Sequence, residues 1–191
     1  MNYLAHILLS GDNVQRQVGG FIADSVKGRH LERFPLHIRE GIVFHRRVDV
    51  FTDEHPLVCE ARALLRPHFG RYTGIFLDVF YDYFLAKKWR QFSQLSLRRF
   101  ACRFYAGLVR NYRWLPLSVR RFLWHFIATN RLCKYATKRG VQRSLWIMGR
   151  YSSLPQMSEE AMRILDKYER ELESGFLEFF SFLLPLSKMS S

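Results

Sequence analysis

The chain has 191 residues, which fits a single domain, and 48% of them are hydrophobic, which excludes an intrinsically disordered protein. Thirty Lys and Arg residues outnumber 17 Asp and Glu residues, so the formal net charge is +13. This charge favours partners that carry negative charge, such as acidic proteins, phosphates or anionic lipids, and does not constrain the fold.

The pattern of the chain predicts helices throughout. There are only six prolines, no Asn-Gly or Asp-Gly turn and no sustained period-two alternation, so no strand is indicated. Apolar periodicity, with no linker or internal repeat, predicts an all-α helical bundle that forms one domain over residues 1–191. The expected helices cover residues 2–9, 13–27, 36–52, 56–66, 72–88, 93–113, 117–137, 139–150 and 158–180.

Single polar side chains interrupt the first two apolar helices. His6 lies in an otherwise apolar part of helix 2–9, and Asp24 follows an apolar stretch of helix 13–27. A lone residue of this kind is more often a hydrogen-bonded core residue than a metal ligand. Neither residue by itself therefore predicts a site.

The stretch between Pro35 and Pro56 carries several polar side chains on one helix face. At 100° per residue, His45, Asp49 and Asp53 fall on the same side, while apolar residues cover the opposite side. The simplest alternative is a solvated face with an ordinary i, i+4 ion pair between His and Asp.

The end of that stretch has a second interpretation. Asp53 is a suitable cap for a new helix that begins with Pro56 in its first turn. His55 lies between them, and it would bring a second imidazole within about a turn of the first.

Helix 72–88 is apolar on nearly every side, which predicts a buried helix, yet it contains Asp78 and Asp82 one turn apart. A buried carboxylate is costly unless a cation compensates it. We therefore expect an arginine, a lysine or a metal ion beside this helix.

The polar side chains that interrupt four different apolar helices include both imidazole nitrogens and carboxylate oxygens. Helical bundles bind Mn²⁺, Fe²⁺ or Zn²⁺ with mixed sets of this kind. The residues therefore predict a metal site before any family is considered.

The positive charge is concentrated in the middle of the chain, because residues 83–157 contain 16 Lys and Arg residues and no acidic residue. The aromatic residues among these cations fit nucleic-acid binding. Since Phe100, Phe104 and Leu108 recur at helical spacing, a buried apolar face with cations outside is the simpler interpretation. We expect residues 83–157 to form a basic surface segment. The partner of this segment is not identified by composition alone.

The cysteines and the apolar stretches of the sequence indicate the cellular compartment of the protein. Cys59, Cys102 and Cys133 are odd in number and widely spaced, which excludes a disulfide framework and favours a reducing, cytoplasmic environment. The N-terminus lacks a signal-peptide pattern, and the most apolar run, residues 176–186, is too short to span a bilayer. We expect no membrane span.

Four motifs in the first 82 residues form a recognisable set, which a later pattern at Leu132-Cys-Lys-Tyr135, Gly140-Val141, Leu145 and Arg150 extends to about residue 150. The four motifs are Asn2-Tyr-Leu-Ala-His6, Gly20-Phe-Ile-Ala-Asp24, His45-Arg-Arg-Val-Asp49-Val-Phe-Thr-Asp53-Glu-His55-Pro56 and Asp78-Val-Phe-Tyr-Asp82. Together they resemble the acyl carrier protein (ACP) phosphodiesterase family, also called ACP hydrolase. The long third motif makes the resemblance specific, whereas the C-terminal helix 158–180 carries none of the motifs.

The resemblance implies an all-α fold related to the HD-domain phosphohydrolases. It implies a hydrolase that removes the 4′-phosphopantetheine arm from holo-ACP to give apo-ACP, with Mn²⁺ or Mg²⁺ as cofactor. In the wider superfamily an Asp directly follows the His, whereas here Arg46 follows His45. The carboxylate partner of His45 is then Asp49 or Asp24.

A catalytic hypothesis follows for the polar residues, in which a metal polarises the phosphodiester and acidifies bound water. The expected metal ligands are His6, Asp24, His45 and Asp78. Asp49 or Asp53 would take or orient the water proton, and Arg46 would hold a phosphate oxygen. His55 would protonate the departing serine oxygen. Asp82 would orient one of the metal ligands without binding the metal itself.

Carrier proteins are small and acidic, so the positive charge of this chain would attract them. We expect Arg98, Arg99 and Arg103 to bind the carrier protein, and we expect this partner rather than nucleic acid. Two alternatives stay open. One is a basic helical module that binds nucleic acid or anionic lipid without catalysis, and the other is an HD-like phosphodiesterase that acts on nucleotides.

Overall fold

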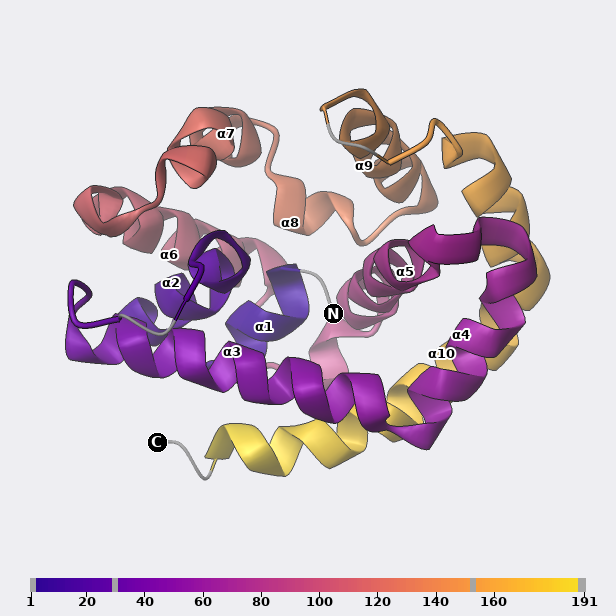
Figure 1. Ribbon diagram of the computed structural model, residues 1–191, viewed down its shortest axis with the longest axis horizontal. Helices are drawn as coiled ribbons and strands as arrows, with labels where there is room; N and C mark the ends of the chain where they lie inside the picture. Colours follow the sequence, from indigo (N-terminus) through magenta and orange to yellow (C-terminus); the bar gives the residue numbers. More distant parts are fainter. Residues whose placement is uncertain (1–2, 29–30, 152–153, 189–191) are drawn as a thin grey trace.

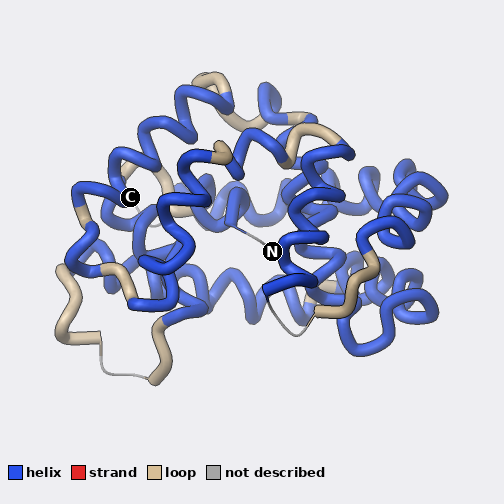
Figure 2. Tube along the Cα trace, turned by 90° about the horizontal axis from the view of Figure 1, so that it is seen from above, coloured by secondary structure: helices blue, strands red, loops and turns tan. Residues whose placement is uncertain are grey.

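The computed structural model describes residues 3–28, 31–151 and 154–188, and within these ranges it contains helices and no strand (Figure 1). Figure 2 shows the same helices joined by short loops. The α-helices are α1 (Tyr3–Leu9), α2 (Val14–Ile22), α3 (Leu36–Glu54), α4 (Pro56–Phe69), α5 (Thr73–Lys87), α6 (Leu97–Arg110), α7 (Leu117–Ala128), α8 (Arg131–Lys134), α9 (Lys138–Tyr151) and α10 (Ser158–Lys188). The 3₁₀ turns are η1 (Ala23–Ser25), η2 (Gly70–Tyr72), η3 (Trp89–Gln91) and η4 (Tyr112–Trp114).

The predicted all-α fold is confirmed, and several predicted helices differ from the structure in their bounds. The helix expected over 13–27 stops at Ile22, because the chain tightens into η1. The helix expected over 93–113 begins later, since the Ser96 side chain accepts a hydrogen bond from the Arg99 backbone and caps α6. The helix expected over 117–137 breaks at Asn130, whose φ of 46° is left-handed and ends the helical path.

The C-terminal helix is longer than residues 158–180. Phe176, Phe179, Phe180 and Leu183 are fully buried, and their spacing continues the apolar face of α10 past the predicted end. Pro185 lies in the last turn and lacks the N–H that would donate to the carbonyl of residue 181, so the hydrogen bond is lost only near the end of the helix. Packing therefore extends this helix beyond the point that local sequence indicates.

Helix α5 is central to the packing. Every residue from Phe76 to Ala86 is buried except Asp78, as the apolar sequence predicts. Helices α1, α4, α9 and α10 pack around it, and Figure 1 shows α4 and α10 side by side along one edge. The buried apolar side chains of the described chain form one continuous cluster, which fits a single domain.

Helices α2 and α3 pack with their backbones in direct contact. A Cβ at Gly19 or at Gly41 would come within 2.1 Å of a carbonyl oxygen of the facing helix, so only glycine permits this approach. The approach places the Gly20 carbonyl oxygen 2.7 Å from Nδ1 of His45. The geometry of this imidazole therefore depends on two glycines without side chains.

None of the described helices is both long and apolar enough to cross a membrane. Cys59, Cys102 and Cys133 are free thiols.

An ionic cluster joins α5, α9 and α10. The Glu169 carboxylate accepts hydrogen bonds from the Tyr83 hydroxyl at 2.8 Å, Lys87 Nζ at 2.9 Å and Lys138 Nζ at 2.6 Å. Burial opposes the ionisation of Glu169, but these donors outweigh it and lower its pKa to about 2. The acidic C-terminal helix thus neutralises part of the positive charge of the basic segment.

Gly41→Ala should separate α2 from α3, because the new methyl group would overlap a backbone carbonyl. We expect the free energy of unfolding in urea to fall by about 1–3 kcal/mol. Gly74→Ala is the matched control, since nothing lies within 4 Å of a Cβ there and alanine favours helix. Equal effects of the two substitutions would contradict the role assigned to the α2–α3 contact.

Glu169→Gln should weaken the protein at neutral pH and make it less sensitive to acid. A carboxylate whose pKa is lowered by folding stabilises the protein above its unfolded pKa of 4.5, and this contribution is lost as pH falls to about 2. We expect a loss of about 1 kcal/mol at pH 7 and a shallower decline below pH 4.5, measured by urea unfolding. Glu171→Gln, at an exposed position on the same helix, should keep the wild-type pH profile.

Candidate metal centre

The candidate site begins at the contact between α2 and α3. His45 is buried on α3, and its Nδ1–H donates to the Gly20 carbonyl of α2 at 2.7 Å. This bond fixes the ring and turns Nε2 towards Asp49 and Asp24. A Gly-Gly pair inside a helix, as at Gly19 and Gly20, permits a close helix contact, but its effect on His45 is visible only in the structure.

Helix α1 supplies the second imidazole. The fully buried Asp82 carboxylate of α5 accepts hydrogen bonds from the backbone N–H groups of Leu4 and Ala5 at 2.9 and 3.1 Å. Burial raises the pKa of Asp82 to about 7 although both N–H donors oppose the rise. The bonds hold α1 so that His6 stacks on His45, with ring centroids 3.6 Å apart. Asp82 therefore positions His6 through the backbone of α1.

Asp49 contacts both imidazoles at their Nε2 edges. Its Oδ1 is 3.1 Å from Nε2 of His6, and its Oδ2 is 3.0 Å from Nε2 of His45. One donor atom from each of these three residues lies within 4.8 Å of the other two. Asp24 Oδ1 is also 3.2 Å from Nε2 of His45, and this carboxylate is 74% exposed. Both carboxylates that the sequence offered as partners of His45 therefore contact it, and Asp24 marks the open side of the site.

Burial and the carboxylates set the charges of these groups. Burial lowers the pKa of His6 to about 4, so this ring is neutral. Burial acts in the same direction on His45, but its contacts with Asp24 and Asp49 outweigh it and raise the pKa to about 9. Burial alone would raise the pKa of Asp49, yet its contacts with His45 and His6 hold it well below the usual range.

The donor set fits a divalent cation. Both ring nitrogens of His6 are buried, and neither makes a well-directed hydrogen bond, although Nε2 approaches Asp49 at 3.1 Å. A buried polar atom left in this way is costly and calls for another partner. Two imidazole nitrogens and a carboxylate supply the nitrogen and oxygen ligands that Mn²⁺, Fe²⁺ and Zn²⁺ accept.

Asp78, the remaining predicted ligand, lies on α5 and is half-buried. Burial raises its pKa, and the nearby charge of Asp49 acts in the same direction. Its carboxylate is not one of the three donors that share the 4.8 Å cluster. Asp49, which the sequence analysis treated as a base, is the donor found there instead, and the ligand role of Asp78 stays a prediction.

Arg46 and Asp53 both make contacts of their own. The Arg46 guanidinium donates to the Val26 carbonyl at 2.8 Å, which holds it beside the loop that follows η1. Asp53 lies in the last turn of α3 and forms an ion pair with Arg62 of α4. The capping interpretation of Asp53 is wrong, because α4 has no side-chain cap.

His55 lies between α3 and α4 and faces α10. Its ring centroid is 5.5 Å from that of Phe51, 5.0 Å from Phe179 and 5.3 Å from Phe182. Its proton-donor role stays a prediction.

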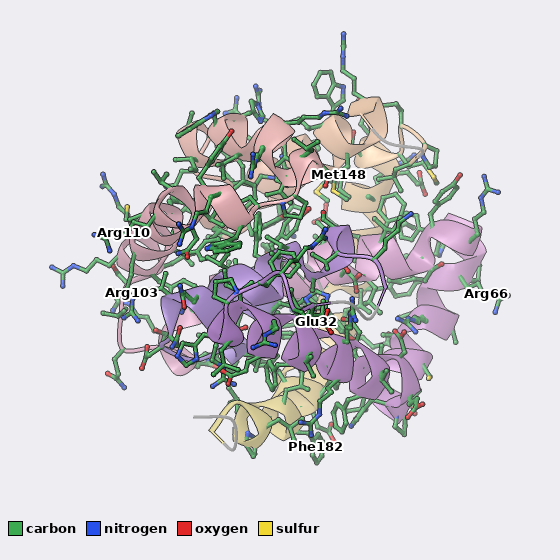
Figure 3. The ribbon with its side chains drawn as sticks, turned by 60° about the vertical axis from the view of Figure 1, so that its left-hand side comes forward. Glu32, Arg66, Arg103, Arg110, Met148 and Phe182 are labelled. Carbon is green, nitrogen blue, oxygen red and sulfur yellow. The ribbon has the colours of Figure 1, made fainter. Side chains whose placement is uncertain are left out.

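The predicted docking arginines lie on α6, and all three are exposed. The Arg103 guanidinium donates to the Asp12 carbonyl, and Figure 3 shows Arg103 at the edge of the molecule with Arg110. Helix α6 packs against α2 and α8. The contribution of Arg98, Arg99 and Arg103 to partner binding stays a prediction.

Comparison with known proteins shows the family of this sequence. The family model described as acyl carrier protein phosphodiesterase matches residues 1–183. The chain belongs to the acyl carrier protein phosphodiesterase family. The resemblance seen in the motifs is confirmed, and it extends past residue 150 into α10.

Curated relatives of this enzyme family match nearly the whole chain. The acyl carrier protein phosphodiesterase of Enterobacter sp. (strain 638) is 32% identical over 194 residues, which cover 98% of each chain. The proteins of the same name from Escherichia coli strains HS and SMS-3-5 are 32% identical over 186 residues, 94% of each chain. No solved structure gives a significant match, so the relation to HD-domain proteins stays a prediction.

Asp49→Asn should weaken Mn²⁺ binding, because the carboxylate that contacts both imidazoles would lose its charge. We expect a loss on the order of 10- to 100-fold in affinity, measured by calorimetric titration of the metal-free protein. Asp53→Asn is the matched control, since it removes the same charge one turn along α3 from a residue paired with Arg62. Equal losses in the two variants would contradict the assigned cluster.

Proposed function

We propose that this chain is a metal-dependent hydrolase that removes the 4′-phosphopantetheine arm from holo-ACP and leaves apo-ACP. The observation that carries the proposal is the cluster of His6, His45 and Asp49, in which two buried imidazoles and one carboxylate converge. The family supports the substrate class, because its relatives are named as acyl carrier protein phosphodiesterases.

The proposed ligands are His6, His45 and Asp49, whereas Asp24, which the sequence predicted as a ligand, is not one of the three clustered donors. Nitrogen donors favour Mn²⁺ over Mg²⁺, which prefers oxygen donors. A bound divalent cation supplies Lewis acidity towards a phosphodiester and makes coordinated water more acidic. Asp78 is a further proposed ligand, since it is close enough to Asp49 for the two charges to interact.

Side chains around the cluster would complete the reaction. Asp24 is exposed and contacts His45, so it is placed to orient water and hold its proton at the open side. We prefer it to Asp53 for this role, because Asp53 is paired with Arg62. The Arg46 guanidinium has five N–H groups, and its bond to the Val26 carbonyl leaves others for a phosphate oxygen.

We also infer a cytoplasmic location. The basis is the free state of all three cysteines, which is typical of a reducing compartment.

The test is release of the prosthetic group from holo-ACP. Protein stripped with EDTA and reloaded with Mn²⁺ should convert holo-ACP to apo-ACP, seen by mass spectrometry as loss of the 4′-phosphopantetheine arm. His45→Gln should abolish release, because it removes the ligand that also binds α2. Asp53→Asn should stay active, and circular dichroism should show both variants folded.

No release with Mn²⁺, Mg²⁺, Fe²⁺ or Zn²⁺ would refute the proposal. Tight, salt-sensitive RNA binding by the same inactive preparation would then support the non-catalytic basic module. Release that persists in EDTA would refute the metal requirement alone.

A further inference from the structure

The outer face of α3 carries an apolar ridge that is exposed in the described structure. Leu36 is 57% exposed, Val43 is 45% exposed and Val50 is 56% exposed. Residues seven apart lie on one side of an α-helix, so the ridge runs for about 21 Å along the helix. Single exposed apolar residues are ordinary, but three on one side of one helix, with arginines and a glutamate between them, can form part of an interaction surface.

Arginines accompany this ridge. Two shallow hollows, of about 530 and 550 Å³, lie along α3 and share Val43 and Arg47 in their walls. Arg39 lines the first hollow and Arg46 lines the second. The Arg39 Nε atom is buried without a hydrogen-bond partner among the described residues, so this guanidinium is held against the protein. The two adjoining hollows, lined by residues of the ridge and by these arginines, together form the groove of α3.

Two glutamates also line these hollows, Glu40 in the first and Glu54 in the second. Glu40 makes a 3.0 Å contact with Nδ1 of His37 and lies 4.0 Å from Nε of Arg16, which also lines the first hollow. The arginines of the two hollows outnumber these glutamates, so the groove has a net positive charge that suits a partner carrying carboxylates.

The groove lies beside the metal cluster. Helix α3 crosses the near side of the molecule in Figure 1 and also carries His45 and Asp49. On a helical projection of α3, Arg46 falls between Asp49 and the apolar ridge. In a holo-carrier protein the scissile bond joins phosphate directly to a serine side chain, so the carrier surface itself must approach the cluster. Helix α6 is farther from it, because α2 packs between α6 and α3.

We propose that the carrier protein docks on the outer face of α3 through an acidic helix with an apolar stripe. The stripe lies along Leu36, Val43 and Val50, and the carboxylates of the helix face Arg39 and Arg47. This inference rests on the proposed function, because it places the carrier serine beside the metal cluster. Buried apolar contact slows dissociation, and the arginines steer the acidic partner during association.

The test compares reversal of the same charge on two helices. One variant combines Arg39→Glu with Arg47→Glu on α3, and its matched control combines Arg98→Glu with Arg99→Glu on α6. Calorimetry in EDTA measures the binding of holo-carrier protein, so the result does not depend on turnover. We expect the α3 variant to bind about 10- to 100-fold more weakly at low salt and the α6 variant to change little.

A second variant tests the ridge without changing charge. Val43→Ser combined with Val50→Ser should weaken binding at low and high salt alike, because it removes apolar contact. Mn²⁺-dependent hydrolysis of bis(p-nitrophenyl) phosphate reports on the metal cluster alone. The α3 variants should keep the wild-type rate in that assay, which also shows that they are folded.

The outcomes separate the docking surface from the proposed activity. Weaker binding of the α6 variant with wild-type binding of the α3 variant overturns the inference and supports the arginines of α6. Equal weakening of both also overturns it, because net charge would then explain binding. A wild-type protein that binds the carrier through α3 but never releases its arm supports the docking surface and refutes the proposed function. A wild-type protein that does not bind the carrier refutes both.

Discussion

Two imidazoles in contact inside the protein are the constraint on which the rest of the site depends. Stacked rings that were both protonated would repel each other, and here burial keeps His6 neutral while the carboxylates keep His45 charged. Asp49 contacts both rings. The fold must therefore bring α1, α3 and η1 to one point, and Asp82 and the glycine contact between α2 and α3 do so.

Local sequence was sufficient for the fold class and for part of the site. Period 3.6 and the absence of turn signals predicted the helices, and the nearly uniform apolar character of α5 predicted its burial. The i, i+4 spacing of His45 and Asp49 placed both on one helix face, which the structure retains. These features depend on neighbours within a few turns, so they are readable from the sequence.

Features that depend on how the helices pack against one another could not be predicted from the sequence. Asp49 rather than Asp78 completes the three-donor cluster, because the rotation and position of α5 relative to α3 decide which carboxylate approaches the imidazoles. Asp82 binds the backbone of a helix 77 residues away in the chain, which no local pattern records. The left-handed Asn130 likewise looks like an ordinary helix residue until the packing of α7 and α8 fixes its backbone.

Charge counted along the chain differs from charge presented at the surface. Residues 83–157 contain 16 cations and no acid, but Lys87 and Lys138 are bound to Glu169 of α10. Part of the excess positive charge of this segment is therefore neutralised by ion pairs between helices. Residues 1–82 contain ten acids and ten Lys or Arg residues, which suggests a neutral surface. In the structure, Asp24 and Asp49 contact His45, and Asp82 binds α1, while arginines gather along the outside of α3. A segment with no net charge can therefore present a positive face along α3, because Asp24, Asp49 and Asp82 contact a histidine or the backbone elsewhere, while Arg39, Arg46 and Arg47 line the hollows of that face.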